Sequence, residues 1–299
     1  MASVADTWSR PAVGLRRRLA DRLATLVVTG AFLLAVAPLA SLLATVVSRG
    51  LARFDAELLT TSMRGVVGAG GGILHAIVGT LVITGVATAV SVPVGVLAAI
   101  HLHEHAAGRR HARALSLLVD VMTGIPSIVA GLFAYALFAL IFGPGVRMGV
   151  MGAVALSVLM VPLVVRTTAE MLALVPGHLR EAAAALGAPR WRTIVQVVLP
   201  TALPGIVTGV LLAVARVVGE TAPLLITTGV VASVNANPFA GRMESLAVFA
   251  FDQYANPGVP REPYLQRAWA AALTLLLIVL ALNVAARLAS RAFGARTRR

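Results

Sequence analysis

Two ionisable residues inside a long apolar run carry the strongest chemical signal in the sequence. Arg216 lies fifteen residues beyond Thr201, where the run begins, and Glu220 follows four residues later. If the run crosses a membrane as a helix, a rise of 1.5 Å per residue places Arg216 roughly 22 Å deep in a hydrocarbon core of about 30 Å. A charge at that depth costs about 2.5 to 3.5 kcal/mol even on the lenient insertion scale. Residues four apart share a helix face, so the spacing predicts that Glu220 neutralises Arg216.

Two interpretations of this pair remain open from its chemistry. A guanidinium in a dry translocation path offers an oxyanion paired, forked hydrogen bonds, and Glu220 would hold it ready when no anion is present. Alternatively, the same two residues form a buried ion pair that only locks helix packing. Gly219, Thr221 and Pro223 next to the pair predict an irregular backbone that faces protein or water rather than lipid.

Two further polar sites lie in other apolar runs. Arg166 and Glu170 are four residues apart and are expected to form a structural pair near the cytoplasmic end of a helix. Gly124 and Pro126 precede Ser127 and predict a local helix break. A membrane serine hydrolase would need an intramembrane serine and histidine. The sequence IPSIVAG has no GxSxG turn and no histidine lies centrally in an apolar run, which argues against that enzyme.

The segment 101–113 contains four histidines, in the sequence HLHEHAAGRRHAR. On a helix only His101 and His105 would share a face, and Ala107 stands where an HExxH zinc motif would need its second histidine. A metal site stays an alternative here. A solvated basic loop whose charge depends on pH is the favoured interpretation.

The composition identifies the elements that must hold these residues. Of the 299 residues, 59% are hydrophobic and only 12% are charged, with a mean hydropathy of +0.90, whereas soluble domains carry about 25% charged residues. The chain is therefore expected to be an all-α integral membrane protein. Apolar runs of at least about 18 residues predict six transmembrane helices, near 23–47, 73–100, 114–142, 150–171, 201–230 and 268–290.

The distribution of arginine predicts the orientation, because all 25 basic residues are arginine. Sixteen lie in the segments 1–22, 101–113, 172–200 and 287–299, and seven lie in the opposite loops 48–72, 143–149 and 231–267. By the positive-inside rule, both termini and the segment 172–200 are expected on the cytoplasmic side.

The net charge of +13 lies mainly next to helix ends, where anionic lipid head groups attract it, so no nucleic-acid partner is expected. The absence of cysteine excludes disulfides and thiolate chemistry. Ala35-Val36-Ala37 has the form of a signal-peptide cleavage site, but the apolar run continues to Val47 and favours an uncleaved first helix. We therefore expect a cytoplasmic segment 1–22, a transmembrane domain 23–290 and a cytoplasmic basic tail 291–299.

The segment 176–200 predicts two short helices joined by a glycine turn. Pro176 and Pro189 suit the first positions of helices, and Gly187 suits the residue that ends one. Pro200 is expected to end the second helix. Because the segment carries three arginines and an apolar stripe that includes Trp191, it is expected outside the bilayer as a docking site or as a plain surface hairpin.

The residues Glu181, Ala182, Ala183, Gly187, Ile194, Leu199 and Pro200 resemble the EAA loop in the membrane subunits of bacterial ABC importers. The resemblance implies a coupling helix that inserts into a groove of an ATPase subunit. The residues expected to make that contact are Glu181, Ala182, Ala183, Gly187, Trp191 and Ile194.

Three further stretches narrow the resemblance. AIVGTL (76–81) with the preceding GGGI (70–73), DVMTGIPSIVAGLF (120–133) and ARVVGETAPLL (215–225) are similar to the PstA-type permeases of bacterial phosphate importers. The resemblance implies the type I ABC permease fold, a bacterial inner-membrane location, and a phosphate path that includes Arg216, Glu220 and Arg166.

The resemblance also implies the assembly: a homologous permease subunit, two copies of an ATPase and an extracytoplasmic phosphate-binding protein. The chain has no GxxxxGK[ST] phosphate loop, so it is expected to be a transporter subunit rather than an enzyme, with ATP used by its partner and no cofactor or metal of its own. The alternatives are a permease for sulfate or molybdate, and a membrane channel or scaffold without ATP coupling.

Overall fold

The computed structural model describes residues 14–105 and 110–296, and all regular structure in these ranges is helical. The predicted terminal segments 1–22 and 291–299 therefore lie partly outside the described residues. The chain divides into two compact units, residues 1–48 and 49–299. Helix α1 (Leu15–Gly50) makes up the first unit and runs 36 residues through Pro38, which is long enough to span a membrane.

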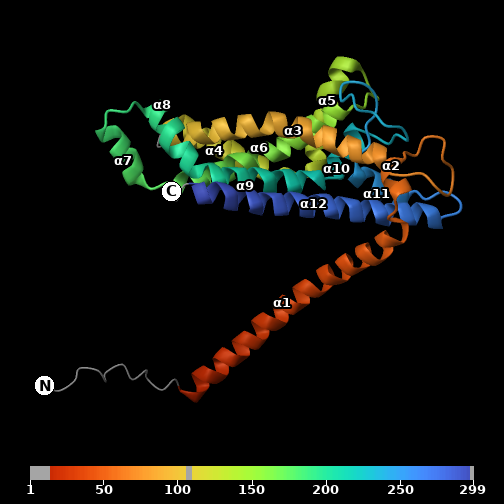
Figure 1. The fold of residues 1–299 in the computed structure, drawn as a ribbon, viewed down its shortest axis with the longest axis horizontal. Helices are drawn as coiled ribbons and strands as arrows, with labels where there is room; N and C mark the ends of the chain where they lie inside the picture. Colours follow the sequence, from red (N-terminus) through yellow and green to blue (C-terminus); the bar gives the residue numbers. More distant parts are fainter. Residues whose placement is uncertain (1–13, 106–109, 297–299) are drawn as a thin grey trace. The chain divides into compact units, whose positions relative to one another are not determined.

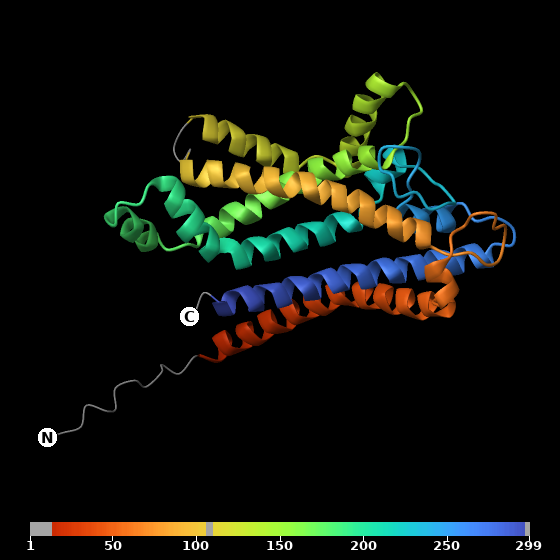
Figure 2. The same cartoon turned by 45° about the horizontal axis from the view of Figure 1, so that its top comes forward.

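The second unit contains the remaining helices, drawn from orange to blue in Figures 1 and 2. In chain order they are η1 (Leu51–Arg53), α2 (Ala56–Thr60), α3 (Leu74–Ile100), η2 (His101–His105), α4 (Arg110–Thr123), α5 (Ser127–Phe142), α6 (Gly149–Ala173), α7 (Gly177–Ala185), α8 (Arg190–Thr193), η3 (Ile194–Val198), α9 (Leu199–Val218), α10 (Ala222–Thr227), α11 (Leu246–Ala255) and α12 (Glu262–Arg296). Of the three short η segments, η2 and η3 are π-helical.

The membrane-spanning helices agree with the predicted all-α architecture. Within the described residues, five helical stretches are long and apolar enough to cross a membrane, and the bent pair α4–α5 brings the number to six if it counts as one span. The five stretches are Leu15–Arg53, Leu74–His105, Gly149–Ala173, Arg190–Val218 and Glu262–Arg291.

Two of the predicted spans are interrupted. The run 114–142 turns by 106° between α4 and α5, at Gly124, Ile125 and Pro126, as the glycine and proline predicted. The run 201–230 is interrupted too, which agrees with the irregular backbone that Gly219, Thr221 and Pro223 predict. Helix α9 ends at Val218, and α10 begins only at Ala222, because Gly219 caps α9 and Pro223 suits the start of a new helix.

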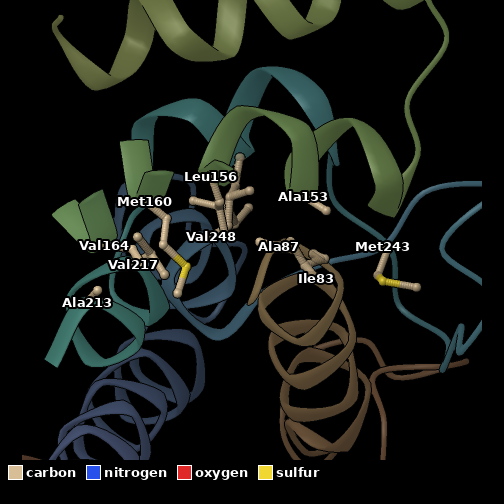
Figure 3. Close-up of a cluster of buried hydrophobic side chains, with 11 residues drawn as sticks. Ile83, Ala87, Ala153, Leu156, Met160, Val164, Ala213, Val217, Met243 and Val248 are labelled. Atoms are coloured by element: carbon tan, nitrogen blue, oxygen red, sulfur yellow. The ribbon is translucent and has the colours of Figure 1, made fainter. Parts of the chain in front are cut away.

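The helices pack around small residues. Helix α3 lies along α6, and α9 lies against both α6 and α12. Figure 3 shows the central apolar cluster of the second unit, in which side chains from α3, α6 and α9 meet residues near α10 and α11. It comprises Ile83, Ala87, Ala153, Leu156, Met160, Val164, Ala213, Val217, Leu224, Met243 and Val248.

The second unit has two distinct ends. The α7–α8 hairpin lies at one end, whereas α2, α11 and the segment 228–245 lie at the other (Figures 1 and 2). At this other end, Gly131 of α5 faces the backbone of Pro223 so closely that a Cβ atom would lie 2.6 Å from the proline Cα. Because Gly131 has no side chain, α5, the second helix of the bent pair, can pack directly against the start of α10.

Candidate functional site

The two helix interruptions face each other across one cavity of about 240 Å³. Thr123, Ile125 and Ser127 line it from the break between α4 and α5, and Arg216 and Glu220 line it from the end of α9. Its remaining lining residues are Met122, Leu159 and Leu163. The stretches 120–133 and 215–225, which resemble the phosphate permeases, therefore form opposite walls of a single cavity.

Arg216 stands on the last turn of α9, where the helix dipole favours a positive charge. Its side chain is exposed in the isolated chain, and Glu220 is half-buried. The predicted ion pair between them is absent from the described residues. The reason is that α9 ends at Val218, so Glu220 lies beyond the helix and the four-residue spacing no longer places it over Arg216.

Arg166 does not line this cavity, and its predicted pairing with Glu170 is also wrong. Its Nη2 atom lies 2.7 Å from Oδ1 of Asp120 on α4, and both side chains are about half exposed. Arg166 and Asp120 line a second cavity of about 350 Å³, together with Arg113 and Ser116.

The two cavities follow one another along the same pair of helices. On α6, Leu159 and Leu163 line the first cavity, whereas Arg166 and Ala169 line the second. The second cavity is therefore nearer to the end that carries the α7–α8 hairpin. Arg216 and Arg166 therefore lie in two separate cavities, which follow one another along α6.

Ser127 has no partner for nucleophilic chemistry in its cavity, since no histidine is among the described residues that line it. The histidines of 101–113 lie elsewhere: the ring centroid of His101 is 6.2 Å from that of His105 and 5.9 Å from that of His111. No group of three or more potential ligands in the described residues has the geometry to hold a metal ion. Residues 106–109 of this segment lie outside the described ranges.

The hairpin has the predicted helix, glycine turn and second helix. Gly187 has φ +76°, the N–H of Gly187 donates to Ala184 O (2.9 Å), and the N–H of Ala188 donates to Ala183 O (3.1 Å). These two bonds are the Schellman motif, which satisfies carbonyls at the end of α7. The expectation that Pro200 ends the second helix is wrong, because the π-turn η3 places the N–H of Leu199 on Ile194 O and the chain continues into α9.

The hairpin exposes a different apolar surface from the one predicted. Trp191 is 59% exposed, but Ile194 is only 7% exposed and Ala183 is buried, so these two stabilise the hairpin from inside. Glu181, Ala182 and Gly187 are exposed. Leu186, which is 88% exposed, was missed, although its position just before the glycine of the turn indicates a protruding tip.

Arg180 fixes the hairpin to the rest of the unit. Its guanidinium donates to Val175 O (2.8 Å), to Leu172 O (3.0 Å) and to Oε1 of Glu104 (2.8 Å). Leu172 lies at the end of α6 and Glu104 lies in η2, beyond α3. Sequence reasoning missed Glu104, because nothing in its spacing connects it to a residue 76 positions later.

Two buried polar contacts at the opposite end were also missed. Oε2 of Glu244 accepts from the N–H of Val231 (3.1 Å) and lies 3.4 Å from Nε2 of His75, with both side chains almost fully buried. Burial raises the pKa of the Glu244 carboxyl. Arg267, which is 1% exposed, donates to Gly68 O and Gly70 O and so orders the glycine cluster before α3.

These features define a polytopic helical membrane protein with a charged cavity at two helix breaks and a protruding hairpin at one end. Residues 91–299 match the family described as binding-protein-dependent transport system inner membrane component. The phosphate transport system permease protein PstA 1 of Mycobacterium tuberculosis (strain CDC 1551 / Oshkosh) is 44% identical over 275 residues, which cover 91% of this chain and 89% of that protein. PstA of Pasteurella multocida (strain Pm70) is 39% identical over 249 residues, 83% of this chain and 86% of its own. The chain therefore belongs to this permease family, in the branch of the PstA proteins.

Solved structures with the same fold are membrane importers. A chain of the inward-facing MetNI methionine ABC transporter gives a TM-score of 0.57 at 22% identity, covering 80% of this chain and 99% of its own. A chain of a bacterial ABC transporter involved in alginate import gives a TM-score of 0.62 at 15% identity, covering 92% and 98%. The predicted ABC importer permease fold is confirmed.

Proposed function

We propose that this chain is the permease subunit of an ATP-driven importer, that it forms part of the translocation path for inorganic phosphate, and that the α7–α8 hairpin couples the path to a separate ATPase. Kinship to phosphate permeases over nine-tenths of the chain carries the proposal. The partners it implies are a homologous permease subunit, an ATPase dimer and an extracytoplasmic phosphate-binding protein. The corresponding location is the bacterial inner membrane, with both termini cytoplasmic.

Arg216 is suited to bind the passing anion, because no carboxylate among the described residues occupies it. A planar guanidinium gives two oxygens of an oxyanion parallel hydrogen bonds. Ser127 lines the same cavity, and its hydroxyl can donate a further hydrogen bond to the anion.

Glu220 favours phosphate over sulfate in this cavity. An ionised carboxylate only accepts hydrogen bonds, so it needs a donor from the ligand. Inorganic phosphate keeps at least one proton near neutral pH and can donate it, whereas sulfate keeps none and would meet like-charge repulsion. Arg216 attracts the anion, and Glu220 selects phosphate over sulfate.

The test is phosphate uptake by the assembled transporter in proteoliposomes. Arg216→Lys keeps the charge but loses the forked geometry, and Arg216→Gln with Glu220→Gln removes both charges. We expect both variants to assemble and to transport phosphate at least about tenfold more slowly, the ratio that 1.4 kcal/mol represents. Arg64→Gln, in an exposed loop, is the control. Uptake at the unmodified rate by the double variant would reduce Arg216 to a packing residue.

A further inference from the structure

Two arginine side chains converge on one glycine at the end of the molecule opposite the hairpin. Gly229 follows α10 with φ +73°, and a Cβ atom built on it would lie 2.9 Å from Cδ and 3.2 Å from Nη1 of Arg147. The same position lies 3.3 Å from Cδ of Arg242. Both side chains therefore pass the same glycine, with the guanidinium of Arg147 and the Cδ atom of Arg242 close to it.

The backbone holds the two arginines in place. The residue after Arg147 is Met148, whose N–H donates to Thr227 O (3.1 Å), and the residue after Arg242 is Met243, whose N–H donates to Thr228 O (3.2 Å). Two segments far apart in sequence are thus fixed to consecutive carbonyls at the end of α10. Arg147 and Arg242 lie next to Gly229 because Met148 and Met243 are hydrogen-bonded to the two residues that precede it.

The described residues provide no counter-ion for either guanidinium. Glu244 is only two positions from Arg242, but its side chain is buried and bound to the N–H of Val231. The carbonyls of Thr227 and Thr228 already accept backbone N–H groups. Two positive side chains that meet at one glycine without a carboxylate repel each other, and a bound anion would relieve that repulsion.

We propose that Arg147 and Arg242 form an outer oxyanion site that receives inorganic phosphate before it reaches Arg216. The inference rests on the proposed function. Helix α10 has 6 residues, a length of about 9 Å, and lies between Glu220 and Gly229 in the chain. Arg242 is exposed and Arg147 is half-buried, so the pair is open to the outside yet anchored. Two guanidiniums match the two negative charges of a phosphate dianion.

The experiment compares phosphate moved with ATP hydrolysed in proteoliposomes that contain the complete transporter. Radiolabelled inorganic phosphate is supplied on a saturating amount of the phosphate-binding protein. We expect Arg147→Gln with Arg242→Gln to keep ATPase stimulation but to lower the phosphate moved per ATP at least about tenfold. The anion released from the binding protein would then escape instead of passing inward. Arg261→Gln, an exposed arginine at the same end, is the control and should change nothing.

Each other outcome decides against a specific part of the proposal. A normal ratio of phosphate to ATP in the double variant would overturn the outer site alone. A normal ratio combined with a greater need for binding protein would assign the arginines to docking an acidic partner surface and would also overturn it. If the unmodified transporter moves no phosphate, the proposed function itself is wrong. If the double variant fails to assemble, Arg242→Gln alone gives the measurement, because that side chain is exposed.

Discussion

Arg216 and Arg166 carry the same side chain, but their surroundings assign them different tasks. Arg216 lines its cavity without an ion-pair partner among the described residues, whereas Arg166 is bound to Asp120 at 2.7 Å. An anion that arrives at Arg166 must displace a carboxylate and can in turn be displaced by it. We therefore propose that Asp120 favours release of the anion from the second cavity, where retention would slow turnover.

Asp120→Asn tests this difference. An exposed ion pair contributes about 1 kcal/mol or less to stability, so we expect the melting temperature of the complex to change little. We expect the maximal rate of phosphate uptake to fall severalfold, because Arg166 then keeps the anion. Glu170→Gln is the matched control, since Glu170 is exposed on α6, the helix that carries Arg166, and makes no ion pair in the described structure. Equal rates in the two variants would contradict a release role for Asp120.

The buried Glu244 carboxyl makes the end opposite the hairpin sensitive to pH. Burial raises its pKa above the ordinary value of 4.5 in the folded state. The stability that its proton supports is complete below 4.5 and is lost as the pH rises through the folded pKa. Glu244→Gln should remove that loss, so the melting temperature of the variant should fall less than that of the unmodified protein as the pH rises. Thermal unfolding in detergent across the pH range checks this, and parallel curves would count against it.

At the scale of elements, the α7–α8 hairpin depends on one backbone conformation. Gly187 is left-handed at φ +76°, and no side chain lies within 4 Å of the Cβ position. A substitution there acts through backbone strain rather than through a clash. The exposed Leu186 and Trp191 flank this turn and depend on it for their relative placement.

Gly187→Val is expected to separate membrane insertion from coupling. A β-branched residue in the left-handed region costs about 1 to 2 kcal/mol, enough to reshape the turn but not the spanning helices. The variant should insert normally and lose its association with the ATPase. Gly177→Ala, at the open start of α7, should retain it. Co-purification of the ATPase with both variants in equal amounts would exclude the hairpin as the coupling element.

The positions of glycine and proline predicted where these elements begin and end. They could not predict which side chains of different helices contact each other. Glycine and proline located the break between α4 and α5 and the turn at Gly187, because both residues restrict the local backbone. Periodicity alone could not show that Glu220 leaves the helix, or that Arg166 finds Asp120 46 positions earlier. The contact between Arg166 and Asp120 depends on how α6 packs against α4, whereas residue spacing describes positions within a single helix.

The two ends of the second unit carry different elements, because the hairpin lies at one end and the segment 228–245 at the other (Figure 2). The arginine distribution of sixteen against seven predicts that the hairpin end faces the cytoplasm. Reporter fusions at Asn256 should therefore report the external side, and fusions near Ala188 the cytoplasmic side. The reverse pattern would invert the orientation, and signals from one side at both positions would contradict the span arrangement.

The three hydrogen bonds of Arg180 give the molecule a mechanical linkage. One guanidinium bonds the hairpin to the end of α6 and to η2, beyond α3. Helix α6 carries Leu163 in one cavity wall and Arg166 in the next. A displacement of α7 at Leu186 would therefore have to break these three hydrogen bonds or carry the end of α6, with its cavity-lining residues, along with the hairpin.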